Sequence, residues 1–202
     1  MLQTRHAPAP DTLFLAPEVG LARARAHEAA GPARVVFALM VAARTTGPVL
    51  WLHPAWTRER LNGDGMRAFL DPGRLVFGRA RSAIDILWAA EQALHSGRVP
   101  LVVADLPEPP GLVPVRRLHL AAEAGATVGP PPLALLLTPG EGGAPGVETR
   151  WRFAPAPGWS KDGAPRWHLH RLRARMAPEA RWEARQGAGG MRLEPVASGP
   201  GA

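Results

Sequence analysis

The chain has 202 residues, with 24 lysines and arginines against 17 acidic residues and a formal net charge of +7. It contains no cysteine, which excludes disulfides, thiolate nucleophiles and zinc–thiolate sites. No apolar run reaches the ~20 residues of a membrane span, and the first residues lack the apolar core of a signal peptide, so we expect a cytoplasmic protein without membrane contact. The length fits one domain, and the charge fits either a genome that favours arginine or a nucleic-acid or acidic protein partner.

The N-terminal quarter predicts a strand, a turn, a buried helix and a second strand. Residues 1–12 are rich in proline and alanine and are expected to be flexible, whereas residues 21–28 lead into the first strand. Residues 33–45 are apolar on nearly every face, which predicts a helix buried beneath a sheet. Gly47 and Pro48 end this helix, and residues 49–52 predict a short buried strand.

The clearest helix is predicted over residues 82–96, after a short strand at 75–77. Ser82 is a good N-cap, and Asp85 follows three residues later, as in a capping box. Four apolar residues form one stripe that we expect to face the core: Ile84, Leu87, Trp88 and Leu94.

The middle of the chain continues this alternation of strands and helices. Residues 101–104 predict a third buried strand, which ends at Asp105. A helix is predicted over 114–125, with Pro114 in its first turn, and a fourth strand over 133–138. Strands that are apolar throughout and alternate with helices indicate a parallel sheet covered on both faces.

The pattern changes after residue 145, where polar and apolar residues begin to alternate. Residues 148–154 and 167–175 have the period of two that is typical of half-buried strands, and 181–185 fit it too. We expect these segments to add antiparallel strands at one sheet edge. Residues 187–202 are rich in glycine, proline and alanine, and we expect them to form a disordered tail.

An ordered series of segments resembles the ImuA family, RecA-like accessory proteins of bacterial mutagenic translesion synthesis, and more distantly RecA and the division inhibitor SulA. The segments that carry the resemblance are 24–32, 48–54, 70–76, 83–97, 102–105, 116–124 and 149–152. The resemblance spans about residues 21–175. It implies an α/β fold with a RecA-like, mainly parallel sheet, flanking helices and antiparallel C-terminal strands. The RecA-like domain would cover residues 13–186, with its basic strands starting at about 147.

The nucleotide site that this resemblance implies is degenerate. Gly31 and Pro32 align with the opening of the phosphate-binding loop, and Asp105 aligns with a magnesium-associated carboxylate. Yet no Gly-x-x-x-x-Gly-Lys-Ser/Thr motif is present, and the only lysine is Lys161, far from the turn. Arg34 is the remaining cation, but without the glycines the backbone has no means to wrap phosphate. We therefore expect no nucleotide, no metal or other cofactor, and no catalytic activity.

Two further departures from RecA point the same way. His53 and Pro54 stand where RecA carries the glutamate that activates water. The segments at the two DNA-binding loops of RecA, residues 106–111 and 139–146, are short here, and the second carries no positive charge. The combined loss of the phosphate-binding loop, the catalytic glutamate and the DNA-binding loops predicts that an ATPase fold serves here as a binding surface.

Paired histidines offer a possible metal site. His168 and His170 would lie on one face of a strand, which is a ligand-competent spacing. Because a metal site needs three or four ligands and no third is evident, we expect them to be surface histidines.

The C-terminal third carries the predicted partner-binding residues, because arginine and tryptophan are interleaved there. Both residue types are enriched in interface hot spots, and both stack on unpaired bases. The pattern fits a protein interface, a single-stranded DNA surface or a solvated sheet edge. The candidates are Trp151, Arg152, Arg166, Trp167, Arg171, Arg173, Arg175 and Trp182.

The resemblance implies a non-catalytic adaptor in SOS-induced translesion DNA synthesis. Its partners would be ImuB, which is a Y-family polymerase-like protein, and the error-prone DNA polymerase subunit, with RecA as a further candidate. One alternative is a regulator that mimics or caps a protomer of the RecA filament. Another is a weak single-stranded-DNA-binding protein.

Overall fold

The structure is a computed structural model, and it describes residues 11–57, 61–158, 163–187 and 190–196. The outermost parts of both expected flexible ends, 1–10 and 197–202, lie outside the described residues, as does Lys161.

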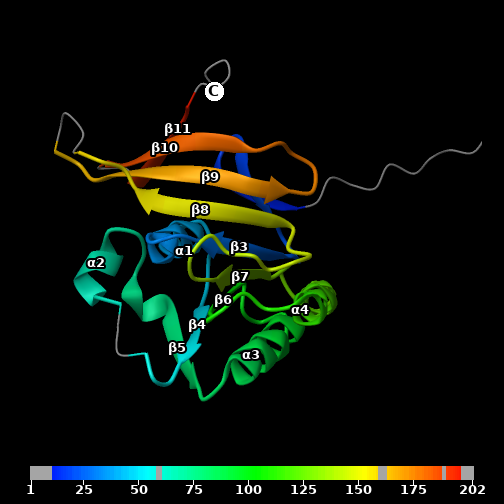
Figure 1. Cartoon of the computed structure of the whole chain (residues 1–202). Helices are drawn as coiled ribbons and strands as arrows, with labels where there is room; N and C mark the ends of the chain where they lie inside the picture. Colours follow the sequence, from blue (N-terminus) through cyan, green and yellow to red (C-terminus); the bar gives the residue numbers. More distant parts are fainter. Residues whose placement is uncertain (1–10, 58–60, 159–162, 188–189, 197–202) are drawn as a thin grey trace, which may run out of the picture.

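A nine-stranded mixed sheet runs through the molecule in the order β11-β10-β9-β8-β3-β7-β6-β4-β5 (Figure 1). Strands β3 to β8 pair in parallel, and β9, β10 and β11 continue the sheet antiparallel at one edge. This confirms a large, mainly parallel sheet with antiparallel C-terminal strands. The strands are β3 (Ala26–Ala30), β4 (Val49–Pro54), β5 (Leu75–Ala80), β6 (Leu101–Asp105), β7 (Leu133–Leu137), β8 (Thr149–Pro155), β9 (Arg166–Ala174), β10 (Ala180–Gly187) and β11 (Gly190–Pro195).

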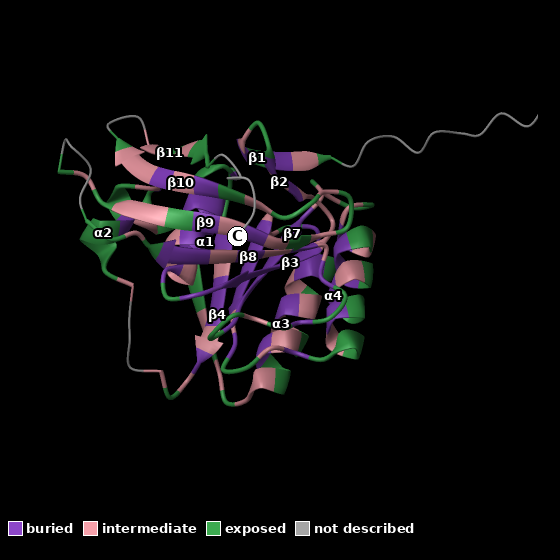
Figure 2. Cartoon of the chain, turned by 45° about the horizontal axis from the view of Figure 1, so that its top comes forward, coloured by how far each residue is buried: buried purple, intermediate pink, exposed green. Residues whose placement is uncertain are grey.

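Helices cover both faces of the parallel part, which explains why its strands are apolar throughout. The helices α1 (Arg34–Ala43) and α2 (Gly63–Arg67) pack on one face, with a 3₁₀ turn at Pro72–Arg74. On the other face, α3 (Ala83–His95) and α4 (Leu112–Gly125) form a second core. Buried residues concentrate in the strands between these two layers (Figure 2).

An N-terminal β-hairpin extends the α1 layer over the C-terminal strands. Strand β1 (Thr12–Ala16) pairs antiparallel with β2 (Val19–Ala22), and both contribute leucines to the core that contains Trp182. The sequence pattern did not separate this hairpin from the first strand of the sheet. Strand β1 begins at Thr12, inside the segment expected to be flexible.

The predicted cap of α3 is confirmed. The Ser82 hydroxyl accepts a hydrogen bond from the Asp85 backbone N–H at 3.1 Å and donates one to the Asp85 carboxylate at 2.8 Å. Both ends of the helix lie within a residue of the prediction. The capping residues therefore determine where this helix begins.

The predicted core stripe of α3 is confirmed for Leu94 and wrong for Ile84 and Trp88. Leu94 is buried and Leu87 is half-buried against the second core, whereas Ile84 is 77% exposed and Trp88 is 59% exposed. Ile86 and Ala90 are buried in their place. The physical reason is the position of the second core, in which Ile86, Ala90 and Leu94 pack with residues of α4, β6 and β7. The other side of the helix, with Ile84 and Trp88, is left largely uncovered by the described residues.

The expected disorder of residues 187–202 is wrong for residues 190–195. These residues form β11, which pairs antiparallel with β10 in a hairpin. Met191 and Leu193 pack against the core from this strand, and they alternate with the polar Arg192 and Glu194. Two apolar residues at strand spacing are therefore enough to add one more strand to the existing edge.

Candidate functional site

The turn before α1 joins β3 to the helix at the carboxyl edge of the sheet. Gly31 adopts a positive φ of 88°. Its N–H donates to the Gly140 carbonyl at 3.0 Å, and the Ala33 N–H donates to the Phe153 carbonyl, also at 3.0 Å. At a helix N-terminus such N–H groups are the ones that bind anions. Here two of them are already bonded to backbone carbonyls.

Strand β8 also fills the space next to this turn. A Cβ added at Gly31 would lie 2.6 Å from the Phe153 carbonyl oxygen. The glycine therefore allows close approach of a neighbouring strand. In a phosphate-binding loop, the same property would serve approach of a ligand.

All four residues of the predicted degenerate site meet at this edge. Gly31, Pro32 and Arg34 belong to the turn and the start of α1, and Asp105 ends β6. The Arg34 guanidinium Nη2 lies 3.7 Å from the Asp105 carboxylate Oδ1, with both side chains mostly buried. The cation is thus compensated within the protein, which leaves less charge to neutralise a phosphate.

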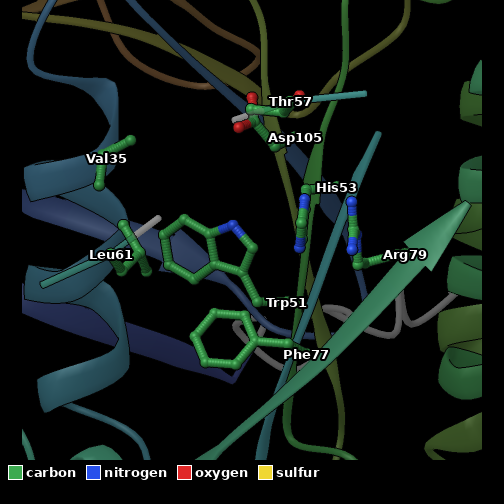
Figure 3. Close-up of a pocket in the computed structure, with 8 residues that line it drawn as sticks. All are labelled: Val35, Trp51, His53, Thr57, Leu61, Phe77, Arg79 and Asp105. Atoms are coloured by element: carbon green, nitrogen blue, oxygen red, sulfur yellow. The ribbon is translucent and has the colours of Figure 1, made fainter. Parts of the chain in front are cut away.

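A pocket of about 540 Å³ opens beside this ion pair, at the carboxyl ends of β4, β5 and β6. Ligands of open α/β sheets bind at this edge. In Figure 3, the rings of Trp51 and Phe77 face the cavity from neighbouring strands, and His53 lies beside Arg79. The lining residues are Val35, Trp51, His53, Thr57, Leu61, Phe77, Arg79 and Asp105.

The polar groups of this pocket are held by local bonds. The Arg79 guanidinium donates to the Ala55 carbonyl. The His53 ring packs edge-on against Phe77, with 6.4 Å between ring centroids. The pocket is suited to an apolar or aromatic group with a polar end near Arg79.

A buried carboxylate that the sequence analysis did not single out organises the same edge. Glu28 lies in β3 with no solvent exposure. It accepts hydrogen bonds from the Thr138 hydroxyl at 2.7 Å, from the Gly143 N–H at 2.8 Å and from the Ala144 N–H at 3.1 Å. Its other oxygen lies 2.5 Å from the Arg150 Nε. The signal was a glutamate inside an otherwise buried strand, because a buried charge requires partners.

Next to Glu28, His27 is held as a buried neutral imidazole. Its Nε2 lies 2.8 Å from the Ala22 carbonyl, which can only accept, so Nε2 carries the proton. Its Nδ1 then accepts from the Thr149 hydroxyl at 2.7 Å, and the Trp151 indole N–H donates to that hydroxyl at 2.6 Å. Burial lowers the pKa of His27 to about 4.

The predicted tryptophan anchors are core residues. Trp151 has no exposed surface and Trp182 is 2% exposed, with 5.9 Å between their ring centroids. Arg171 lies against both rings, and its guanidinium donates to the carbonyls of Pro178 at 2.9 Å and Glu18 at 3.0 Å. The prediction that these three side chains form a docking surface is therefore wrong. The inward face of their strands is covered by α1 and the hairpin.

Trp167 lies on the same inward face, where it is half-buried, packs against that core and stacks on Phe153 with 6.0 Å between ring centroids. The other candidates are arginines at or near the opposite face of these strands. Arg166 forms a two-pronged pair with Glu183, which raises the pKa of the arginine and lowers that of the glutamate.

Three other arginines differ in whether they have a carboxylate partner. Arg152 pairs with Glu141. Arg173 and Arg175 are exposed and form no ion pair with another residue in the described ranges. In the residues that the structure describes, this outward face is therefore a partly neutralised polar surface without an exposed tryptophan.

The paired histidines do not come together with a third ligand. His170 lies 3.5 Å from the Glu179 carboxylate, and His168 is exposed. Within the part of the chain that the structure describes, no group of three or more acidic or histidine side chains is arranged to hold a metal ion. None of the described helices combines the length and the apolar character needed to cross a membrane.

Comparison with known proteins identifies no relative. No protein-family model matches the chain, and no curated protein matches it.

Proposed function

We propose that this protein is a non-catalytic adaptor of the ImuA kind, with a RecA-like body that docks the components of an error-prone polymerase complex. The partners proposed are ImuB and the error-prone DNA polymerase subunit, in SOS-induced translesion synthesis in the cytoplasm. The mainly parallel sheet with an antiparallel C-terminal edge agrees with the architecture that this resemblance implies.

The observation that carries the proposal is the closed turn before α1. The Gly31 and Ala33 N–H groups donate to the carbonyls of Gly140 and Phe153, and Arg34 is paired with Asp105. Opening the turn to a triphosphate would break both backbone bonds and part the ion pair. A protein that keeps the sheet but commits these groups internally is better suited to recognition than to ATP hydrolysis.

The single-stranded DNA alternative loses support from the same geometry. Base stacking needs exposed aromatic faces. Trp151 and Trp182 are buried, and Trp167 is covered on one side by Phe153. The exposed arginines Arg173 and Arg175 would supply only phosphate contacts, which bind DNA weakly at physiological salt.

One feature favours the RecA-filament regulator as a second candidate. Among the described strands, β5 lies at the edge of the sheet and pairs with β4 alone. Val76 and Phe77 on it are 53% and 48% exposed. An uncovered edge of this kind is able to accept a strand from another protein.

Co-purification of the full chain with each partner alone distinguishes these roles. We expect retention by ImuB or by the error-prone polymerase subunit in the absence of nucleotide. Capture of RecA without either partner, together with loss of RecA-driven ATP hydrolysis, would favour the second candidate. If none of the three proteins is retained, the adaptor proposal is wrong.

A further inference from the structure

The outer side of α3 and α4 carries an apolar surface that neither core uses. Ile84 and Trp88 are one turn apart on α3, and Val113 and Leu120 are two turns apart on α4. Their exposed fractions are 77%, 59%, 67% and 65%. Scattered single apolar residues on a surface need no explanation, but these four lie on two adjacent helices, with Arg117 between Val113 and Leu120. We call this the α3–α4 face.

The face is hollowed where the two helices meet. A depression of about 150 Å³ lies between Ile84, Leu87 and Trp88 on one side and Val113 and Pro114 on the other. A cavity of that order holds a benzene-sized group. The depression therefore accommodates one large apolar side chain, and the flanking helices form the walls of a groove. Grooves of this kind bind amphipathic helices through anchors spaced one turn apart.

The charges around the groove have a small positive sum, with Arg81, Arg116 and Arg117 against Asp85 and Glu91. Glu91 and Arg117 line the depression and pair across it, with 2.9 Å between Nε and Oε2. Arg81 lies just before the N-cap of α3, and Arg116 follows Val113 by three residues on α4. Both are exposed, and neither forms an ion pair with any residue that the structure describes. Two uncompensated arginines thus flank an apolar groove.

The positive charges of Arg81 and Arg116 restrict which partner can cover the α3–α4 face. In a symmetric contact between two copies the same arginines would meet each other, which disfavours a second copy. The terminal segments outside the described residues, 1–10 and 197–202, contain no aspartate or glutamate. A covering element that satisfies both the groove and the arginines must carry apolar anchors and carboxylates together.

We propose that the α3–α4 face binds an amphipathic helix of another protein, with apolar anchors that enter the depression and with acidic residues on its flanks. The inference rests on the proposed adaptor role in taking the occupant to be a protein. The acidic flanks lie against Arg81 and Arg116, and an anchor packs between Trp88 and Val113.

The test uses the full chain and two synthetic helical peptides of equal length. Both carry leucine at positions i, i+4 and i+7, and one has glutamate on the flanks where its twin has lysine. Binding is measured by fluorescence anisotropy of labelled peptide. The variants are Trp88→Glu and Arg116→Glu, with Met176→Asp as the matched control, because Met176 is 90% exposed and lies in the turn between β9 and β10.

We expect the glutamate peptide to bind and the lysine peptide to bind at least about tenfold more weakly. Trp88→Glu and Arg116→Glu should each weaken binding of the glutamate peptide by about tenfold or more, and Met176→Asp should not change it. Equal binding of the two peptides, or no binding of either, overturns the proposal. So does a wild-type dimer in sedimentation that Trp88→Glu dissociates, because a second copy would then occupy the face.

Failure here is distinguishable from failure of the adaptor role. The peptide titration contains no polymerase protein, so a negative result removes the α3–α4 face alone. Loss of co-purification with every proposed partner removes the adaptor role, whatever the peptides do.

Discussion

The carboxylate of Glu28, fully buried in β3, lies 2.5 Å from the guanidinium of Arg150 in β8. The same carboxylate accepts the N–H groups of Gly143 and Ala144. This ion pair therefore joins two neighbouring strands to the loop that carries Gly140. The Gly140 carbonyl in turn accepts a hydrogen bond from the Gly31 N–H. The closed turn before α1 depends on this arrangement.

Removing one partner of this pair is predicted to destabilise the protein strongly. Arg150→Met leaves a buried carboxylate without its cation and should lower the free energy of unfolding by about 3–5 kcal/mol. The double variant Glu28→Gln/Arg150→Met should recover part of that loss, since no buried charge remains. Urea unfolding of the wild type, both single variants and the double variant measures the coupling. If the loss of unfolding free energy in the double variant equals the sum of the losses in the two single variants, the account is contradicted.

Gly31→Ala tests how closely β8 approaches the turn. The new Cβ would lie 2.6 Å from the Phe153 carbonyl oxygen at a φ of +88°, and we expect a loss of at least about 3 kcal/mol. Gly140→Ala is the matched control, because its φ is +61° but nothing lies within 4 Å of the added atom. That variant should lose only about 1 kcal/mol, from backbone conformation alone. Equal losses in chemical denaturation would mean that the turn is open beside Phe153.

The buried His27 predicts how stability depends on pH. Its pKa is about 4 in the folded protein and about 6.5 in the unfolded chain. Between these values the unfolded state binds a proton that the native state does not. Stability should therefore fall as pH drops from about 6.5 to about 4 and lose no more from this residue below that, by about 3 kcal/mol in total.

NMR titration of the imidazole carbon-bound protons measures the native pKa of His27 directly. His27→Gln removes the titrating group and, if it folds, should flatten the stability curve over that pH range. A native pKa near 6.5 in the wild type would be inconsistent with an imidazole sealed between Ala22 and Thr149.

Trp182→Ala is predicted to destabilise the whole protein rather than to remove a partner contact. The indole is buried against Trp151 and Arg171, and truncation should lower the free energy of unfolding by about 3–5 kcal/mol. Arg173→Ala, on the exposed side of β9, should change it by less than about 0.5 kcal/mol. Thermal unfolding of the two variants provides the comparison. A stable Trp182→Ala variant would restore the idea that this residue is a surface anchor.

The sequence predicted the parts of the fold that depend on local chemistry. The Ser82 cap of α3 and the continuously apolar strands near 101–104 and 133–138 were found, because capping and burial on both faces leave direct marks in the residue pattern. The switch to alternating strands after residue 145 was found for the same reason.

What the sequence did not settle was which side of an element meets a neighbour. The alternation in β8 and β9 separates two faces, but only the hairpin and α1 make the Trp151 side the inner one. On α3, two apolar stripes compete, and the packing of the second core against α4 and the sheet selects the one with Ile86 and Ala90. The Glu28 network joins residues 110 to 122 positions apart, which no local pattern reveals.

The pocket beside Trp51 is likewise a product of tertiary packing that no local sequence pattern reveals. His53, Arg79 and Asp105 end three strands that are far apart in the chain, and the parallel sheet brings those ends to one edge. The sequence placed His53 and Asp105 at strand ends correctly. Their common cavity depends on the order β6-β4-β5, which follows from tertiary packing.

Calorimetric titration of the full chain with Mg²⁺-ATP tests the central claim most directly, which is that the turn before α1 is closed to phosphate. We predict no heat beyond that of dilution, for the wild type and for Arg34→Ala alike. A saturable isotherm with a micromolar Kd in the wild type that Arg34→Ala abolishes would contradict the account.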